Sequence, residues 1–362
     1  MRVNGQAHRS LWPAPQRDAL CVIDQRALPH HLRIERLQSV TAVHDAIRDM
    51  WVRGAPLIGA TAAYGLALQA RDDASNADLL CACRHLASAR PTAVNLAWAL
   101  QRVWAQLQRL PVHARAEAAW READAIADED VATNQAIGHH GLVLLAELSR
   151  RRQRRIHVLT HCNAGWLATV DWGTALAPVY MAQAAGIDVH VWVDETRPRN
   201  QGASLTAWEL AQQGVPHTLI ADNAGGHLMQ RGQVDIVIVG CDRVSANGDV
   251  CNKIGTYLKA LAAHDNGVPF YAAMPLSTFD AALQDGLAQI PIEERHAREL
   301  THITGRDAQG AAVEVQLAPD GTAVANPAFD VTPARLVTGL ITEHGVVAAQ
   351  ADALRRLLEP KP

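Results

Sequence analysis

Two side chains that can take part in chemistry follow directly after short apolar runs in this sequence of 362 residues. Cys162 ends the run IHVLTHC (156–162), and Asp242 ends the run DIVIVGCD (235–242). A cysteine near a helix N-terminus can act as a nucleophile or a base, and the turn NAGW after Cys162 favours such a helix start. A cysteine that only packs in the core is the alternative. A Cys–His pair with His161 is disfavoured, because adjacent residues leaving a strand point to opposite faces.

Two arginines stand directly before predicted helix starts and could bind an anion. Arg53 opens the motif RGAP, and Arg90 opens the motif RPTAVN. Free N–H groups at a helix N-terminus together with a guanidinium form an anion site, and Gly54 would allow close approach to the backbone. A solvated arginine beside a helix cap is the alternative for each. Because the arrangement occurs twice, anion binding is favoured more than either motif alone would favour it.

A polar loop, DETRPRNQGASLTAWEL (194–210), follows another apolar run. Its side chains Arg197, Arg199 and Gln201 could reach a phosphate group or sugar hydroxyls. No GxGxxG motif follows the first strand, and no GxxxxGK[ST] motif occurs, so neither a dinucleotide nor ATP is expected. The sequence also lacks HExxH and a Cys/His quartet at metal spacing, so we expect neither cofactor nor metal.

The elements that must position these residues alternate between strand and helix after residue 155. Short apolar runs predict strands at 156–162, 188–195, 216–223, 235–242 and 268–275, with helical patterns at 166–185, 204–214, 225–232 and 252–264. This alternation is typical of a parallel, doubly wound sheet. Ligands bind outside the carboxyl ends of such strands, so Cys162 and Asp242 should lie on one rim. Asn252 and Lys253 are expected to open the last of these helices.

The first third of the chain is mainly helical in pattern. Helices are predicted at 39–50, 55–70, 91–110 and 114–148, with a short extended piece at 20–25. Pro91 suits the first position of its helix. The predicted fold class is α/β: a helical N-terminal domain (1–127) with a short extended segment, followed by a Rossmann-like parallel-sheet domain (128–362). Residues 303–325 are predicted to form a loop or a hairpin.

Composition narrows the class of protein. Hydrophobic residues make up 49% and charged residues 19%, which is typical of a globular chain, and the net charge of −4 gives no sign of nucleic-acid binding. Arg150–Arg155 holds five arginines in six residues, which suits a helix C-terminus better than an RNA or anion patch. Six cysteines without a CxxC motif, an N-terminus without an apolar core and no long apolar run predict a cytoplasmic protein without a membrane span.

The motifs RGAPLIG, RPTAVNL, THCNAG, ETRPRNQG..LTAWEL, GCDRV..NGDVCNKIGTY and NPAFDVTP together resemble those of the methylthioribose-1-phosphate isomerase family of methionine salvage. The resemblance runs from about residue 23 to residue 346. The wider family shares its fold with ribose-1,5-bisphosphate isomerases and with regulatory subunits of eukaryotic initiation factor 2B. The resemblance implies a homodimeric, metal-independent aldose–ketose isomerase whose partner is a small sugar phosphate and whose site lies between two domains.

Carried over residue by residue, the resemblance implies that Cys162 and Asp242 are catalytic. The implied phosphate and sugar contacts are Arg53, Gly54, Ala55, Arg90, Gln201, Asn252 and Lys253. Cys241 and Cys251 stand where the family commonly has alanine, and both are small enough to leave the assignment unchanged.

The implied substrate explains a carboxyl group at the end of an apolar strand. Phosphorylation of the C1 oxygen prevents the sugar ring from opening spontaneously, so an acid must protonate the ring oxygen. We expect Asp242 to do this, with a pKa raised by desolvation despite the nearby cations. Cys162 could take the C2 proton or stabilise the developing charge, by either an enediol route or a hydride shift.

Two alternatives remain open at this stage. The first is an isomerase of a related sugar phosphate, either 5-deoxyribose 1-phosphate or ribose 1,5-bisphosphate. The second is a non-catalytic binding subunit like those of the initiation factor. The presence of both Cys162 and Asp242 argues against the second, because a binding subunit has no need of that pair.

Overall fold

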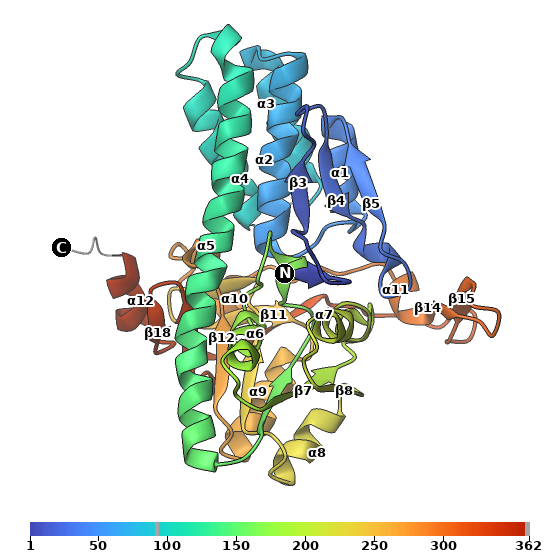
Figure 1. The fold of residues 1–362 in the computed structure, drawn as a ribbon, viewed down its shortest axis with the longest axis vertical. Helices are drawn as coiled ribbons and strands as arrows, with labels where there is room; N and C mark the ends of the chain where they lie inside the picture. The colour runs from blue at the N-terminus through green and yellow to red at the C-terminus, as the bar shows by residue number, and fades with distance from the viewer. Residues whose placement is uncertain (91–93, 359–362) are drawn as a thin grey trace.

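The computed structural model describes residues 1–90 and 94–358. A mainly helical part and a part built on a parallel sheet stack along the long axis of the molecule (Figure 1). The α/β fold class predicted from the sequence is confirmed. Among the described residues, none of the helices has both the length and the apolar character needed to cross a bilayer.

Helices and a small antiparallel sheet form the N-terminal part. The helices are α1 (Val40–Arg48), α2 (Ala55–Asp72), α3 (Asn76–Ser88) and α4 (Val94–Leu107). The sheet has the order β3 (Leu11–Pro13), β4 (Leu20–Ile23), β5 (Ile34–Leu37), and a hairpin of β1 (Arg2–Val3) and β2 (Gln6–Ala7) precedes it. The predicted opening of α4 at Pro91 lies outside the described residues. Small and apolar side chains let α2 sit buried at the centre of this part.

One long helix connects the two parts. α5 (Val112–Arg152) contains 41 residues and packs against α2 in the helical part and against α6 (Ala177–Ala184) in the other. The predicted boundary between residues 127 and 128 falls inside α5 and stays a prediction. The arginine cluster ends this helix, and Arg154 and Arg155 pair with Asp235 and Asp188, which agrees with the helix-end interpretation.

The large sheet has seven strands in the order β18-β17-β12-β9-β6-β7-β8, and all pairs are parallel except β17–β18. The strands are β6 (Ile156–Thr160), β7 (Val189–Asp194), β8 (His217–Ile220), β9 (Ile236–Val239), β12 (Phe270–Ala273), β17 (Gly339–Thr342) and β18 (Gly345–Val347). The five strands predicted from the sequence are all present. α6, α7 (Ala207–Gln212), α8 (Ala224–Gln230) and α9 (Thr256–Asp265) lie between them in the chain.

A second sheet lies after β9 and corrects one prediction. Its order is β13 (Phe279–Asp280), β10 (Arg243–Ser245), β11 (Val250–Lys253), β16 (Phe329–Thr332). Asn252 and Lys253 therefore end a strand instead of opening a helix, and α9 begins only at Thr256. Pairing of β11 with β10 and β16 outweighs the helical pattern of this segment.

The remaining segments include a confirmed hairpin and a shortened helix. β14 (His302–Arg306) and β15 (Ala312–Gln316) form the hairpin predicted for 303–325, next to α11 (Arg298–Thr301). The helix predicted at 166–185 is a single 3-10 turn at Trp166–Ala168, and α6 follows only from Ala177. Further short helices are α10 (Gly286–Gln289) and α12 (Ala351–Leu358), together with 3-10 turns at Gln25–Ala27, Leu276–Thr278 and Ala334–Leu336.

Candidate active site

The direction in which successive strands are added to the large sheet reverses between β6 and β9. From β6 the chain adds β7 and β8 on one side, and it then returns to place β9 against β6 on the other. Ligands in doubly wound folds bind at this switch point, outside the carboxyl ends of the strands. Cys162 follows β6 and Asp242 follows β9, and both line one cavity there. The N-terminus of α2 closes the cavity from the helical part.

The backbone around Cys162 is unusual. Cys162 has a φ of 66°, in the left-handed region that few residues other than glycine adopt. Its N–H donates to Thr196 Oγ1 at 2.8 Å, and its Sγ donates to Gln201 Oε1 at 3.2 Å. The predicted helix start beside Cys162 is wrong, because a short turn follows the loop instead. Cys162 is therefore held by the loop after β7, through Thr196 and Gln201, and its thiol does not lie at a helix N-terminus.

Asp242 stands between the two sheets, where its N–H donates to Cys251 O at 2.9 Å. Burial raises the pKa of its carboxyl group, while Lys253, Arg53 and Arg90 act in the opposite direction and Glu293 adds to the rise. The direction matches the expectation that desolvation outweighs the nearby cations. A carboxyl group with a raised pKa can carry a proton closer to neutral pH than an ordinary aspartic acid does.

Lys253 and Asn252 reach the site from the end of β11. Burial lowers the pKa of the Lys253 ammonium, and the neighbouring Cys162 and Asp242 partly offset that effect. Lys253 Nζ also lies 4.8 Å from the centre of the Phe329 ring. Asn252 is 5% exposed, lines the same cavity as Cys162 and donates to Thr256 Oγ1 at 3.0 Å.

The first arginine motif forms the start of α2 as predicted. Gly54 is the N-cap residue with a φ of 96°, and a Cβ there would overlap the backbone of Ala168. Ala55 is the first helical residue and lines the cavity. The buried Arg53 guanidinium donates to Asn163, through Nη1 to Oδ1 at 2.5 Å and through Nη2 to the carbonyl oxygen at 2.7 Å. Arg53 thus connects the α2 N-terminus to the loop of Cys162.

The second arginine lines an adjoining cavity together with Gly54, Ala55 and Asp242. Arg90 Nη2 lies 3.4 Å from Glu293 Oε2, and its buried Nε has no acceptor among the described residues. Burial lowers the pKa of this guanidinium. A buried guanidinium in the wall of a cavity favours the binding of an anion such as a phosphate group.

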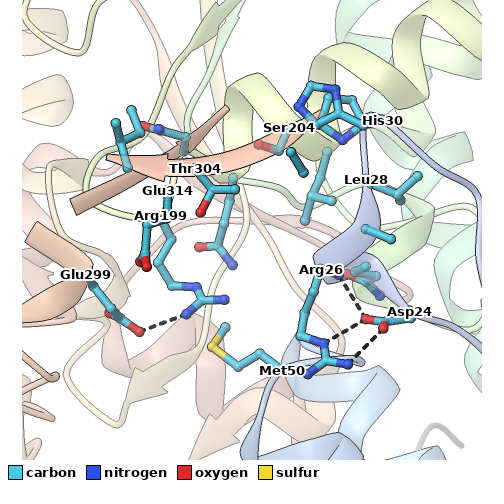
Figure 2. Close-up of a pocket in the computed structure, with 18 of the residues that line it drawn as sticks. Asp24, Arg26, Leu28, His30, Met50, Arg199, Ser204, Glu299, Thr304 and Glu314 are labelled. Atoms are coloured by element: carbon cyan, nitrogen blue, oxygen red, sulfur yellow. Dashed lines mark hydrogen bonds and ion pairs between the residues drawn. The ribbon is translucent and has the colours of Figure 1, made fainter. Parts of the chain in front are cut away.

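A cleft of about 690 Å³ opens beside these cavities and contains Arg53 and Gln201 in its wall. Figure 2 shows Arg26 and Arg199 on different sides of it, held by Asp24 and Glu299. Arg199 and Gln201 of the loop after β7 line the cleft, and their contact with a phosphate or sugar stays a prediction. Arg197 lines none of the cavities described here and instead donates to the Leu300 carbonyl at 2.8 Å.

Sequence analysis missed a buried charged network beneath the site. His161 places its two ring nitrogens 2.8 Å from Asp194 Oδ2 and 2.8 Å from the Ile254 carbonyl oxygen. Lys259 Nζ lies 3.1 Å from the same Asp194 oxygen. The strand-end rule predicts that His161 and Asp194 lie on the same rim as Cys162 and Asp242, but it gives no sign of the hydrogen bonds and ion pair between them. Nothing in the sequence marks Lys259, which lies on α9.

His161, Asp194 and Asp222 are also the one group of possible metal ligands found among residues 1–90 and 94–358. Lys259 fills the cation position there, because its Nζ also donates to the Asp222 carbonyl oxygen at 2.5 Å. Both Asp222 carboxylate oxygens accept backbone N–H groups, those of Thr196 and Arg197. The arrangement therefore suits an ammonium group better than a divalent metal.

Comparison with known proteins shows the family to which the chain belongs. The family model of the initiation factor 2 subunit family matches residues 51–349, and the chain belongs to that family. Within it, the chain groups with the methylthioribose-1-phosphate isomerases. The relative from Methylobacterium nodulans with that name is 62% identical over 99% of this chain and 98% of its own length.

Two solved structures share the whole fold. The crystal structure of 5-methylthioribose 1-phosphate isomerase from Pyrococcus horikoshii OT3 has 41% identity and a TM-score of 0.84, covering 97% of this chain and 96% of the other. The structure of the translation initiation factor eIF-2B subunit delta from A. fulgidus has 40% identity and a TM-score of 0.78, covering 96% and 100%.

Proposed function

We propose that this protein converts the aldose 5-methylthioribose 1-phosphate to the ketose 5-methylthioribulose 1-phosphate in methionine salvage. The observation that carries the proposal is the cavity at the β6–β9 switch point, which Cys162 and Asp242 both line. The arginines and Lys253 around it supply the positive charge that a sugar phosphate needs.

The proposed reaction divides the chemistry between two side chains. Asp242 gives its proton to the ring oxygen as the bond from that oxygen to C1 breaks, which frees the C4 hydroxyl. The hydrogen on C2 then moves to C1, and the C2 hydroxyl becomes the ketone as its proton passes to the Asp242 carboxylate, which restores the acid. In an enediol route Cys162 takes the C2 proton, whereas in a hydride shift C2 transfers its hydrogen directly. Deuterium from D₂O in the product at C1 would identify the enediol route.

The decisive experiment measures isomerisation of three substrates by the purified protein without added metal. These are 5-methylthioribose 1-phosphate, 5-deoxyribose 1-phosphate and ribose 1,5-bisphosphate. We expect the highest kcat/KM for the first. Absence of turnover with all three would favour a binding subunit, the second alternative, even though Cys162 and Asp242 are present.

We also propose that the protein is a cytoplasmic homodimer. The six free cysteines among the described residues fit a reducing compartment. The dimer is what the family resemblance implies, and Leu219 on β8 and Leu258 on α9, which are 49% and 58% exposed, are candidates for its interface. Light scattering of the purified protein tests the dimer.

Arg53→Ala and Arg90→Ala are each expected to weaken binding of the sugar phosphate by ~1.5–3 kcal/mol, the range for hydrogen bonds to charged groups. Inorganic phosphate should compete with substrate for the wild-type protein. The measurement is KM and the inhibition constant of phosphate. Arg121→Ala is the matched control, because this exposed arginine pairs with Glu117 on its own helix. Unchanged constants in both site variants would place the anion elsewhere.

Turnover is expected to survive a strong chelator, because Lys259 already supplies the cation in the one cluster that resembles a metal site among the described residues. The measurement compares kcat before and after dialysis against EDTA. Loss of activity in EDTA that zinc or magnesium restores would contradict this prediction.

A further inference from the structure

A fully buried carboxyl group, that of Glu209 on α7, lies behind the loop of Cys162. Its Oε1 accepts from Asn163 Nδ2 and the Leu167 N–H, and its Oε2 accepts from the Trp166 N–H and the Tyr180 hydroxyl. The four distances lie between 2.7 and 2.9 Å. One side chain therefore fixes most of the loop that begins at Cys162.

The helix that carries Glu209 begins with an unusual turn. Residues Gly202–Thr206 form a π-helix, in which the Ala207 N–H donates to the Gly202 carbonyl oxygen. Residues five apart lie about 140° apart around an α-helix, whereas the wider π turn brings them nearer to one side. Gln201 and Thr206 consequently both reach the cysteine loop: Gln201 accepts from the Cys162 thiol, and Thr206 Oγ1 donates to the Cys162 carbonyl oxygen at 2.7 Å.

Asn163 connects Glu209 to Arg53 through hydrogen bonds on both sides of its side-chain amide. Its Nδ2 donates to Glu209 and Thr206, so its Oδ1 must face the other way, where it accepts from Arg53. Its carbonyl oxygen accepts from the same guanidinium. The position of Arg53 at the cavity thus depends on an amide whose orientation Glu209 selects.

The surrounding glycines leave room for this carboxyl group. A Cβ on Gly165 would overlap Glu209 Oε2, although its φ of −92° is one that any residue adopts. A Cβ on Gly173 would in turn overlap Gly165. The close packing explains why two glycines face each other here as an isolated bridge.

We propose that Glu209 is a positioning residue, which acts through Asn163 to hold Arg53 against the substrate phosphate. This inference rests on the proposed function, since it requires a phosphorylated substrate. Residues 206–210 (TAWEL) would then contribute to substrate binding without touching the sugar themselves.

Glu209→Gln is the first test, because it keeps the shape but replaces one acceptor with an NH₂ group. Whichever way the new amide turns, that group faces a backbone N–H, of either Leu167 or Trp166. We expect KM for 5-methylthioribose 1-phosphate to rise at least ~10-fold, since small displacements of substrate-positioning groups are costly. Tyr180→Phe is the control: it removes one donor to Glu209 and leaves the Asn163 contacts intact, so KM should stay within about twofold.

A double-mutant cycle distinguishes positioning from a merely structural role. If Glu209 acts through Arg53, then adding Glu209→Gln to Arg53→Ala should change KM by less than about twofold. If the double variant instead showed the product of the two single-variant increases in KM, the inference would be overturned. A folded Glu209→Gln protein with a normal KM would overturn it as well. Gly165→Ala displaces the carboxyl group without removing it and should raise KM likewise. If Glu209→Gln does not fold, a folded Gly165→Ala protein with normal KM overturns the inference.

The outcomes also separate this inference from the proposed function. A wild-type protein that does not isomerise the sugar phosphate refutes the function itself. A wild-type protein that is active, with Glu209→Gln kinetics unchanged, refutes only the role of Glu209.

Discussion

Replacing Asp242 by asparagine is expected to lower kcat by at least ~10²-fold, the usual scale for the loss of a general acid. Asparagine keeps the size of the side chain and can still bind oxygen atoms, but it has no proton to give to the ring oxygen. The substitution also removes a desolvated carboxyl group, so the fold should not be weakened. Steady-state kinetics together with thermal unfolding measure both effects.

The pH dependence gives a second view of the same residue. An acid must be protonated to act, so kcat should fall on the alkaline side as Asp242 loses its proton. Because burial raises the pKa of this carboxyl group, the fall should come at a higher pH than an ordinary aspartic acid would give. The alkaline limb should disappear or move in the residual activity of Asp242→Asn.

A matched control and a contrary outcome complete the Asp242 test. Asp128→Asn changes an exposed carboxylate that pairs with Arg9 and lines none of the three cavities described above, and its kcat should be normal. Infrared spectroscopy of the substrate-bound protein can detect the protonated carboxyl group directly. If Asp242 proved ionised throughout pH 5 to 8, it would have to act as a base or an electrostatic stabiliser instead.

Cys162→Ser is expected to reduce kcat by at least ~10²-fold as well. Serine can still donate to Gln201 Oε1, so the loop should keep its shape, but a hydroxyl is a far weaker acid than a thiol and seldom becomes an anion. Cys81→Ser, which changes an exposed cysteine on α3, is the control and should leave kcat unchanged. Near-normal turnover of Cys162→Ser would remove the thiol from the mechanism and leave Asp242 without its proposed partner.

The sequence was most informative where a local pattern matched the final environment. The apolar runs before Cys162 and Asp242 are buried parallel strands, and the rule for strand ends placed both residues at one cavity. The helix start after Arg53 and Gly54 could be predicted for the same reason, since a helix start depends on a few neighbouring residues. The catalytic and binding roles of these residues stay predictions.

Prediction failed where distant segments decide the local conformation. Asn252 and Lys253 lie in a strand because β16, nearly eighty residues later in the chain, pairs with them. The helix predicted from residue 166 ends after one turn, because Val170 bonds to distant partners: its N–H donates to Asp130 Oδ2, and its carbonyl oxygen accepts from the Ser10 N–H. Such long-range partners leave no periodic signal in the segment itself, so no reading of the segment alone would find them.

The length of α5 has a mechanical consequence. A continuous helix of 41 residues spans about 60 Å and is packed against both parts of the molecule. A hinge motion between the two parts would bend α5 or separate it from α2 or α6, so we expect Cys162 and Asp242 to stay at the same cavity when no ligand is bound. We therefore expect substrate and product to exchange through motion of small peripheral segments, such as α11 and the β14–β15 hairpin, which line the cleft. Amide hydrogen exchange should accordingly be fast in that hairpin and slow along the middle of α5, whether or not substrate is bound.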